Sequence, residues 1–169
     1  MIGLVSSISF CQLGHSLTVA TLPRRMARTD LSSLVRLRAG ISVLKARSVP
    51  CAILSNGDPE MLGVAVKSAG FETLLDHVLS VHAVRRYKTD PAAYALGPQA
   101  LGLPARQILF VSSNGWDAIG AAWQGYTTLW VNRQGLPLEQ LDTEPTRIGS
   151  SLRDVLGFFP PDLQPSMTP

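Results

Sequence analysis

Polar side chains that could bind and orient a small anion occur in three clusters of this sequence: 55–57, 85–88 and 112–117. In the first cluster, Ser55 and Asn56 supply hydroxyl and carboxamide donors next to turn N–H groups, which suit a negative group. Lys88 adds a full positive charge that suits a carboxylate or a phosphate. In the third cluster, Asp117 could hold a water molecule or orient Lys88. Together these residue types predict an anion site that also holds one carboxylate.

Each cluster taken alone also fits an ordinary structural role. A Ser-Asn-Gly triplet after a strand is common as turn and cap chemistry. A single lysine is usually solvated, and Trp116 could serve packing alone. The functional interpretation therefore depends on whether the fold brings the three clusters together.

The elements around the clusters predict that it does. Short apolar stretches that are typical of strands alternate with helical stretches between residues 48 and 132. The expected strands are VPCAIL, HVLSV, QILFVSS and TTLWVN, and the expected helices begin at Asp58, Asp90 and Gly115, with an interruption or kink at Gly97–Pro98. This alternation predicts an α/β fold, a parallel sheet with helices on both faces. Right-handed crossovers bring the carboxyl ends of such strands to one edge, where ligands bind.

The two ends of the chain differ from this middle part. The stretch MIGLVSSISF predicts a strand, and a helical stripe of Leu34, Leu37, Ile41 and Leu44 follows Asp30 as its N-cap. SSLRDVLGFF predicts a last short helix before a Pro-rich tail. We therefore expect an atypical segment over 1–47, a core over 48–159 and a flexible tail over 160–169.

The amino-acid composition limits the classes of protein to which this chain can belong. The chain is 46% apolar and 16% charged, which is typical of a folded protein, and it holds no apolar run long enough to span a membrane. The net charge of +3 is uneven, because residues 1–29 contain no acid. No nucleic-acid motif accompanies these basic residues. Cys11 and Cys51 show no paired spacing, and the histidines form no metal cluster with them, which favours a reducing, cytoplasmic location.

Three stretches of the sequence are similar to one known family. AILSNGDPEML, YKTDPAAYAL and LFVSSNGWDAIGA, within residues 45–133, resemble the haloacid dehalogenase superfamily and specifically its type II L-2-haloacid dehalogenases. The resemblance implies a Rossmann-like core and hydrolysis of short 2-haloalkanoic acids to 2-hydroxy acids. In that family an aspartate attacks C2, displaces halide and forms an ester that water cleaves.

The resemblance also implies residue roles. Ser55 corresponds to the residue that receives the substrate carboxylate, with Asn56 near the leaving halide. Lys88 corresponds to the essential lysine that neutralises the nucleophile, and Tyr94 to a tyrosine that assists there. The residues implied to hold Lys88 and to position the hydrolytic water are Ser112, Asn114 and Asp117. Trp116 corresponds to an aromatic side chain that lines the pocket.

The metal chemistry of the family divides its members. Phosphatase members hold magnesium with two acids in the last motif, whereas here Asp117 is the only acid among neutral neighbours. One carboxylate is a poor site for a hard cation. The resemblance therefore implies a metal-independent dehalogenase without a cofactor.

Two parts of the family pattern are missing. The nucleophilic aspartate normally lies in a first-strand motif Phe-Asp-x-Tyr-Gly-Thr, which this sequence lacks. Its nearest echo, FCQLGHS, would put Cys11 at the nucleophile position, and Asp30 is the only acid before residue 58. The forty-four residues from Cys11 to Ser55 are too few for a strand, a helical cap and a returning helix. The sequence thus predicts a truncated or rearranged chain with an absent or shortened cap.

Two functions from different classes follow. The first is a hydrolase of the 2-haloacid dehalogenase type, impaired or working through an unrecognised nucleophile such as Cys11. The second is an inactive module that binds a small carboxylate or another protein, and a face left uncovered by a missing cap favours a homodimer. Neither nucleic acid nor membrane is an expected partner.

Overall fold

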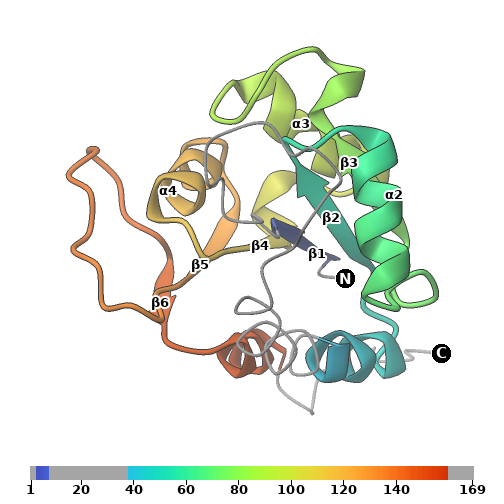
Figure 1. Cartoon of the computed structure of the whole chain (residues 1–169). Helices are drawn as coiled ribbons and strands as arrows, with labels where there is room; N and C mark the ends of the chain where they lie inside the picture. Colours follow the sequence, from blue (N-terminus) through green and yellow to red (C-terminus); the bar gives the residue numbers. More distant parts are fainter. Residues whose placement is uncertain (1–2, 8–37, 160–169) are drawn as a thin grey trace, which may run out of the picture.

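The centre of the molecule is a six-stranded parallel sheet (Figure 1). The computed structural model describes residues 3–7 and 38–159. Its strands are β1 Gly3–Ser7, β2 Cys51–Ser55, β3 His77–Ser80, β4 Ile108–Ser112, β5 Thr127–Val131 and β6 Arg147–Gly149. Their order in the sheet is β3-β2-β1-β4-β5-β6, and every neighbouring pair is parallel. The expected parallel α/β sheet is therefore confirmed, with β1 at its centre.

The helices follow the strands as the caps and glycines predict. The longer ones are α2 Pro59–Ser68, α3 Pro91–Leu101 and α4 Gly115–Trp123, and residues 38–46 are also helical. Short 3-10 helices are η1 Val81–Ala83, η2 Ala105–Gln107 and η3 Leu152–Phe158. Asp58 and Asp90 cap α2 and α3, since each side chain accepts a hydrogen bond from the N–H two residues later. None of the described helices has the length and hydropathy needed to cross a membrane.

Alternating side chains of the strands build a core on each face of the sheet. Leu109 and Val111 of β4 pack on one face with residues of the 38–46 helix, of α2 and of η3. Ile108 and Phe110 pack on the other face with residues of α3, such as Tyr94, and of α4, such as Ala121. Both faces are thus covered by helices, as the near-continuous apolar strands predict.

The sequence led us to expect an interruption or kink of helix α3 at Gly97–Pro98. The helix is not interrupted there and continues to Leu101. A proline at 98 has no N–H for the carbonyl of Tyr94 four residues earlier. The Tyr126 hydroxyl donates to that carbonyl instead. The side chain of the residue just before β5 thus replaces the missing backbone donor inside a buried core, and the helix continues.

The ends of the core also depart from the expected elements. The sequence did not predict β6, a three-residue strand beside β5. The last predicted helix is the 3-10 helix η3, which begins at a capping box made by Ser151 and Asp154. Ile41 and Leu44 are buried as predicted, whereas Asp30, Leu34 and Leu37 lie outside the described residues. Only 38–46 are helical among the residues described between β1 and β2.

Candidate active site

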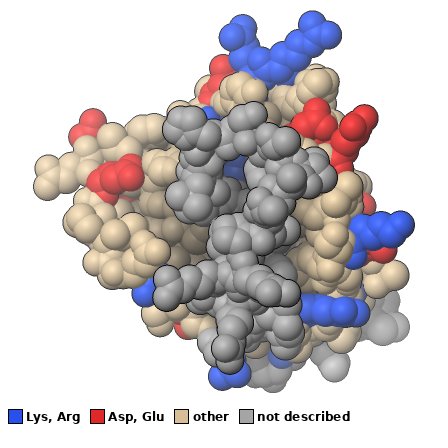
Figure 2. Space-filling view, in the orientation of Figure 1, with Lys and Arg blue, Asp and Glu red and all other residues tan. Residues whose placement is uncertain are grey.

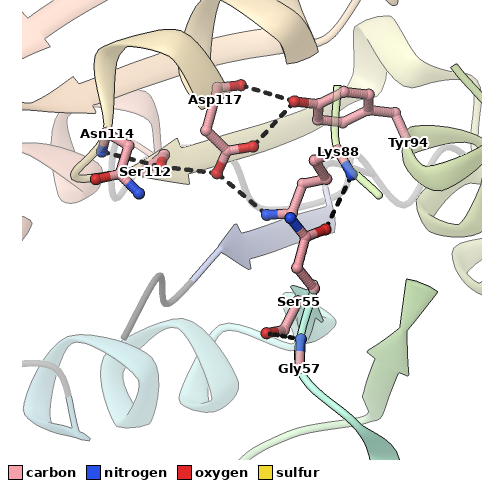
Figure 3. Close-up of polar contacts among 8 residues, drawn as sticks. Ser55, Gly57, Lys88, Tyr94, Ser112, Asn114 and Asp117 are labelled. Carbon is pink, nitrogen blue, oxygen red and sulfur yellow. Dashed lines mark hydrogen bonds and ion pairs between the residues drawn. The ribbon is translucent and has the colours of Figure 1, made fainter. Parts of the chain in front are cut away.

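The loops after β2, β3 and β4 meet at the carboxyl edge of the sheet, and Lys88 and Asp117 form the centre of that meeting (Figure 3). Lys88 comes from the loop between β3 and α3, and Asp117 from the first turn of α4. The Nζ atom of Lys88 lies 3.1 Å from Oδ2 of Asp117, and the two side chains are 3% and 0% exposed. Charges this deeply buried are stable in proteins only when they are paired.

Three donors converge on the carboxylate of Asp117. Oδ2 accepts from Lys88 Nζ and from Ser112 Oγ, at 3.1 and 2.9 Å, and Oδ1 accepts from the Tyr94 hydroxyl at 3.0 Å. Ser112 is itself positioned, since its Oγ accepts from the backbone N–H of Asn114 at 3.1 Å. Both carboxylate oxygens are therefore engaged by side chains from α3, β4 and the Lys88 loop.

The electrostatics of Lys88 set burial against its partner. Burial lowers the pKa of the Lys88 ammonium below its ordinary value, and the charge and hydrogen bond of Asp117 act in the opposite direction. The ammonium also lies 5.5 Å from the centre of the Phe110 ring, a further favourable contact. The positive charge of the site therefore depends on Asp117.

Tyr94 reaches Asp117 only because α4 carries a glycine at position 120. A Cβ built on Gly120 would lie 2.5 Å from the Tyr94 hydroxyl oxygen. Burial, followed by the negative charge of Asp117, raises the pKa of Tyr94. The hydroxyl is therefore a neutral donor. No pattern in the sequence indicates this role of Gly120, because close approach between two helices depends on tertiary packing.

The other side of the site is formed by Ser55 and Asn56. Ser55 Oγ accepts from the backbone N–H of Gly57 at 3.0 Å, and Asn56 Oδ1 accepts from the backbone N–H of Lys88 at 2.9 Å. Ser80 Oγ donates to the carbonyl of Gly57 at 2.7 Å and so ties this turn to β3. Ser55 and Asn56 are only partly buried. Asn56 thus links the Ser55 turn directly to the loop that carries Lys88.

The remaining predicted residues lie at the start of α4. Asn114 occupies the N-cap position, but its side chain makes no cap hydrogen bond, and Trp116 is half-buried in the first turn. Trp130 of β5 donates from Nε1 to the carbonyl of Ser113 at 3.2 Å and holds this turn. The sequence did not single out Trp130, because a tryptophan within an apolar strand is typical of a core residue.

Positive charge gathers on the loop between β3 and α3. Figure 2 shows Lys and Arg side chains at the top of the molecule, where Figure 1 places the loop between β3 and α3. That loop includes Arg85 and Arg86, both exposed. Arg86 Nε is 4.0 Å from Asp90 Oδ2, a weak surface pair that leaves the loop basic. Such a field attracts anions.

Two further predictions concern cysteine and metal chemistry. Cys11 lies outside the described residues. Cys51 is buried in β2, and burial raises the pKa of its thiol to about 11, so Cys51 is a poor nucleophile. Within 3–7 and 38–159, no three His, Cys, Asp or Glu side chains are grouped as a metal site requires.

The chain is similar in sequence to known proteins. A family model described as haloacid dehalogenase-like hydrolase matches residues 24–125. The (S)-2-haloacid dehalogenase of Pseudomonas sp. strain YL is 47% identical over 116 residues, which cover 69% of this chain and 50% of the relative. The chain therefore spans about half the length of the curated relatives it matches.

The chain is also similar to solved structures of haloacid dehalogenases. The crystal structure of the L-2-haloacid dehalogenase RSc1362 is similar with a TM-score of 0.69 and 60% identity, over 71% of this chain and 53% of that chain. The L-2-haloacid dehalogenase of Xanthobacter autotrophicus with chloropropionic acid covalently bound gives a TM-score of 0.65 and 31% identity, over 72% and 59% of the two chains. With a family model that covers more than half of its 169 residues, this chain belongs to the haloacid dehalogenase-like hydrolases.

Proposed function

We propose that the carboxyl edge of the sheet binds a small 2-substituted carboxylate, a 2-haloacid or the corresponding 2-hydroxy acid, between the Ser55 turn and Lys88. One observation carries the proposal. A buried ammonium is held by Asp117, and its own backbone N–H is bonded to Asn56, so a cation and a set of neutral donors are fixed at one edge. Cation and donors together match a carboxylate.

The contacts support a separate role for each residue. The Ser55 hydroxyl and the amides of its turn would receive the carboxylate, and Asn56 would lie beside the 2-substituent. Lys88 would supply the positive charge. Because both oxygens of Asp117 already accept hydrogen bonds, orienting Lys88 is favoured over holding a water molecule, with Ser112 and Tyr94 supporting Asp117. Asn114 and Trp116 would line the pocket from α4.

Turnover is the second part of the proposal. Hydrolytic dehalogenation of the family type needs a carboxylate nucleophile, and no acid occurs among residues 1–29. Losing a covalent nucleophile typically costs several orders of magnitude in rate. We therefore expect chloride release from L-2-chloropropionate close to the uncatalysed rate. Release at a rate typical of dehalogenases, abolished by Lys88→Ala, would contradict this expectation.

Binding is tested by calorimetry with L-2-chloropropionate and with lactate. Lys88→Met should abolish the heat of binding, whereas Lys67→Met, which removes an exposed lysine of α2, should leave it unchanged. If Lys88→Met does not fold, Ser55→Ala provides the same test from the half-exposed side. No heat from the unmodified chain at millimolar ligand would refute the proposal.

A non-catalytic interaction role is the alternative, and the face formed by α2 and β3 favours it. Met61, Val64 and Val78 are 58%, 67% and 43% exposed there, and β3 is the edge strand of the sheet. Exposed apolar surface beside a strand edge promotes self-association. Light scattering should then show a dimer that Val64→Lys dissociates. A monomer at all concentrations would exclude this alternative.

A further inference from the structure

A hollow of about 700 Å³ lies where the edge strand β6 leads into η3, and the proposed function does not use it. Figure 1 shows the chain passing from β6 into η3 at the lower end of the molecule. A hollow of this volume is large enough for a small ligand. We call it the β6 hollow, and its lining includes Arg147, Gly149, Ser150, Arg153, Asp154 and Gly157.

The β6 hollow is separate from the Lys88 site. Strand β6 is two places from β4 in the sheet. Neighbouring strands lie about 4.8 Å apart, so roughly 10 Å of sheet separates these two strands. None of the described residues that line the hollow belongs to the clusters 55–57, 85–88 and 112–117. Binding in the hollow and binding at Lys88 can therefore be measured independently.

The side chain of Arg147 is held against η3 by two of its residues. Its guanidinium carbon lies 4.4 Å from the centre of the Phe158 ring, a cation–π contact. A Cβ built on Gly157 would lie 2.8 Å from the Nη1 atom of Arg147, so this glycine leaves the space that the guanidinium occupies. A guanidinium placed in this way loses less side-chain freedom when it binds an anion.

The guanidinium donors of Arg147 and Arg153 are open to a ligand. Both side chains are exposed, and within the described part of the chain they make no hydrogen bond and no ion pair. Each guanidinium carries five N–H donors in a planar fork that matches the oxygens of a phosphate or a carboxylate. The hollow therefore presents two cations whose hydrogen-bonding capacity the described residues do not use.

One carboxylate, that of Asp154, also lines the hollow, and its hydrogen bonds go to the backbone. Oδ2 of Asp154 accepts from the N–H groups of Ser150 and Ser151, each at 3.0 Å, as part of the capping box that begins η3. Gly149 allows this approach, because a Cβ there would collide with the carboxylate. Two guanidiniums and one carboxylate held by backbone donors leave the hollow with a net positive charge.

We propose that the β6 hollow is a second anion site, which binds the phosphate group of a small molecule through Arg147 and Arg153. This inference does not depend on the proposed function at Lys88. A phosphate dianion carries more charge than a carboxylate and offers a third oxygen, so it can accept from both guanidiniums at once. The negative charge of Asp154 in the same hollow disfavours a weaker anion. Phosphate is therefore the class of ligand that the hollow fits.

The test titrates the full chain with inorganic phosphate and follows the resonances of backbone amides and of arginine Nε–H groups. We expect saturable shifts within residues 147–157, and smaller ones with acetate. Arg147→Gln and Arg153→Gln should each lower the phosphate affinity by about tenfold or more. The matched control is Arg133→Gln, which removes an exposed arginine beside Asn132 that does not line the hollow. It should change the affinity by less than about twofold.

The position of Arg147 is tested without removing its charge. In Gly157→Ala the new Cβ would displace the end of this flexible side chain, so the fold should remain and the phosphate affinity should fall by about fivefold. Gly63→Ala, whose Cβ would meet nothing within 4 Å, should leave the affinity unchanged. An affinity that Gly157→Ala does not change would show that phosphate does not use Arg147 in this position, and would overturn the inference.

Other outcomes of the phosphate titration would also overturn the inference. Equal losses of affinity for Arg147→Gln, Arg153→Gln and Arg133→Gln would mean that phosphate responds to the general surface charge. Phosphate shifts confined to residues 55–57 and 88 would mean that the anion binds at the Lys88 site alone. No shifts at millimolar phosphate would mean that the hollow binds no phosphate. None of these outcomes bears on the binding of lactate at Lys88, which is measured separately.

Discussion

The two sides of the site are built differently. On the α4 side, Asp117 is fully buried and both its oxygens accept hydrogen bonds from side chains. On the α2 side, Ser55 and Asn56 are partly exposed, and their side-chain oxygens accept hydrogen bonds from the backbone N–H groups of Gly57 and Lys88. The first side holds a charge in a fixed place, and the second presents donors to the solvent.

From this difference we infer that the α4 side carries stability and the α2 side carries recognition. A buried, satisfied network is costly to disturb, because each donor or acceptor left behind is desolvated and unpaired. A half-exposed turn can exchange its partners for water or for a ligand at little cost. Substitutions on the α4 side should therefore mainly destabilise the fold, and substitutions on the α2 side should mainly weaken binding.

The largest effect should come from Asp117→Ala, which leaves the ammonium of Lys88 buried without this partner. Losing one member of a buried ion pair typically costs about 3–5 kcal/mol. Urea unfolding at pH 7 measures the loss. The matched substitution on the α2 side is Asp58→Ala, which removes an exposed helix cap and should cost only about 1 kcal/mol. Equal losses would contradict the contrast between the two sides.

The same pair predicts a pH dependence. Burial lowers the pKa of Lys88 in the folded chain below its ordinary value of 10.5. Between the lowered value and 10.5 the unfolded chain binds more protons, so this lysine makes the free energy of unfolding rise with pH. Asp117→Ala should extend that rise to lower pH, because the partner that raises the lysine pKa is gone. Unchanged pH profiles would show that Asp117 does not hold the charge of Lys88.

Gly120→Ala should give the next effect, since its Cβ would lie 2.5 Å from the Tyr94 hydroxyl oxygen. Overpacking of this kind typically costs about 1–3 kcal/mol. Adding Tyr94→Phe should recover part of the loss by removing the clashing oxygen. Gly63→Ala on α2 meets nothing within 4 Å and should instead stabilise by about 0.5–1 kcal/mol. A loss at both glycines would mean that helix position, not the approach of Tyr94, sets the outcome.

Tyr126→Phe tests the support of α3 and should cost about 1 kcal/mol, because the buried carbonyl of Tyr94 loses its donor. Pro98→Ala restores a backbone N–H at the position that the carbonyl would normally bond. Thermal unfolding should therefore show a smaller loss for Tyr126→Phe when Pro98→Ala is also present. Simple additivity of the two changes would refute the exchange of donors.

The smallest effect on stability should come from Ser55→Ala, below about 1 kcal/mol, because the Gly57 N–H that it leaves can be solvated. Its effect on lactate affinity should be larger, about tenfold or more, if the hydroxyl donates to a charged group. Calorimetry and urea unfolding of the same variant compare the two. A large loss of stability with unchanged affinity would reverse the assignment of the α2 side.

The sequence predicted most of the elements that position the site, and the reasons are local. Asp58 and Asp90 begin their helices where the caps predict, and the apolar strands before Ser55 and Ser112 form as expected. The alternation of strands and helices also predicted that the loops after the strands would converge at one edge of the sheet. The sequence therefore indicated that Asp117 could orient Lys88, and the two side chains do form an ion pair.

What the sequence missed depends on tertiary contacts. The uninterrupted α3 requires the Tyr126 hydroxyl, which is far along the chain from Pro98. Strand β6 is three residues long and partly exposed, which is too short for a periodicity. The place of β1 between β2 and β4 cannot be read from chain order, because the sheet order is not the sequence order. Its register, which puts Ser7 level with Ser112, follows from that place.

The central claim, that a small carboxylate binds between the Ser55 turn and Lys88, is tested most directly by following backbone amide resonances during a lactate titration. We expect saturable shifts confined to residues 55–57, 88 and 112–117, with the amide of Lys88 among them because it bonds to Asn56. No shifts at millimolar lactate, or shifts confined to other parts of the molecule, would contradict the account.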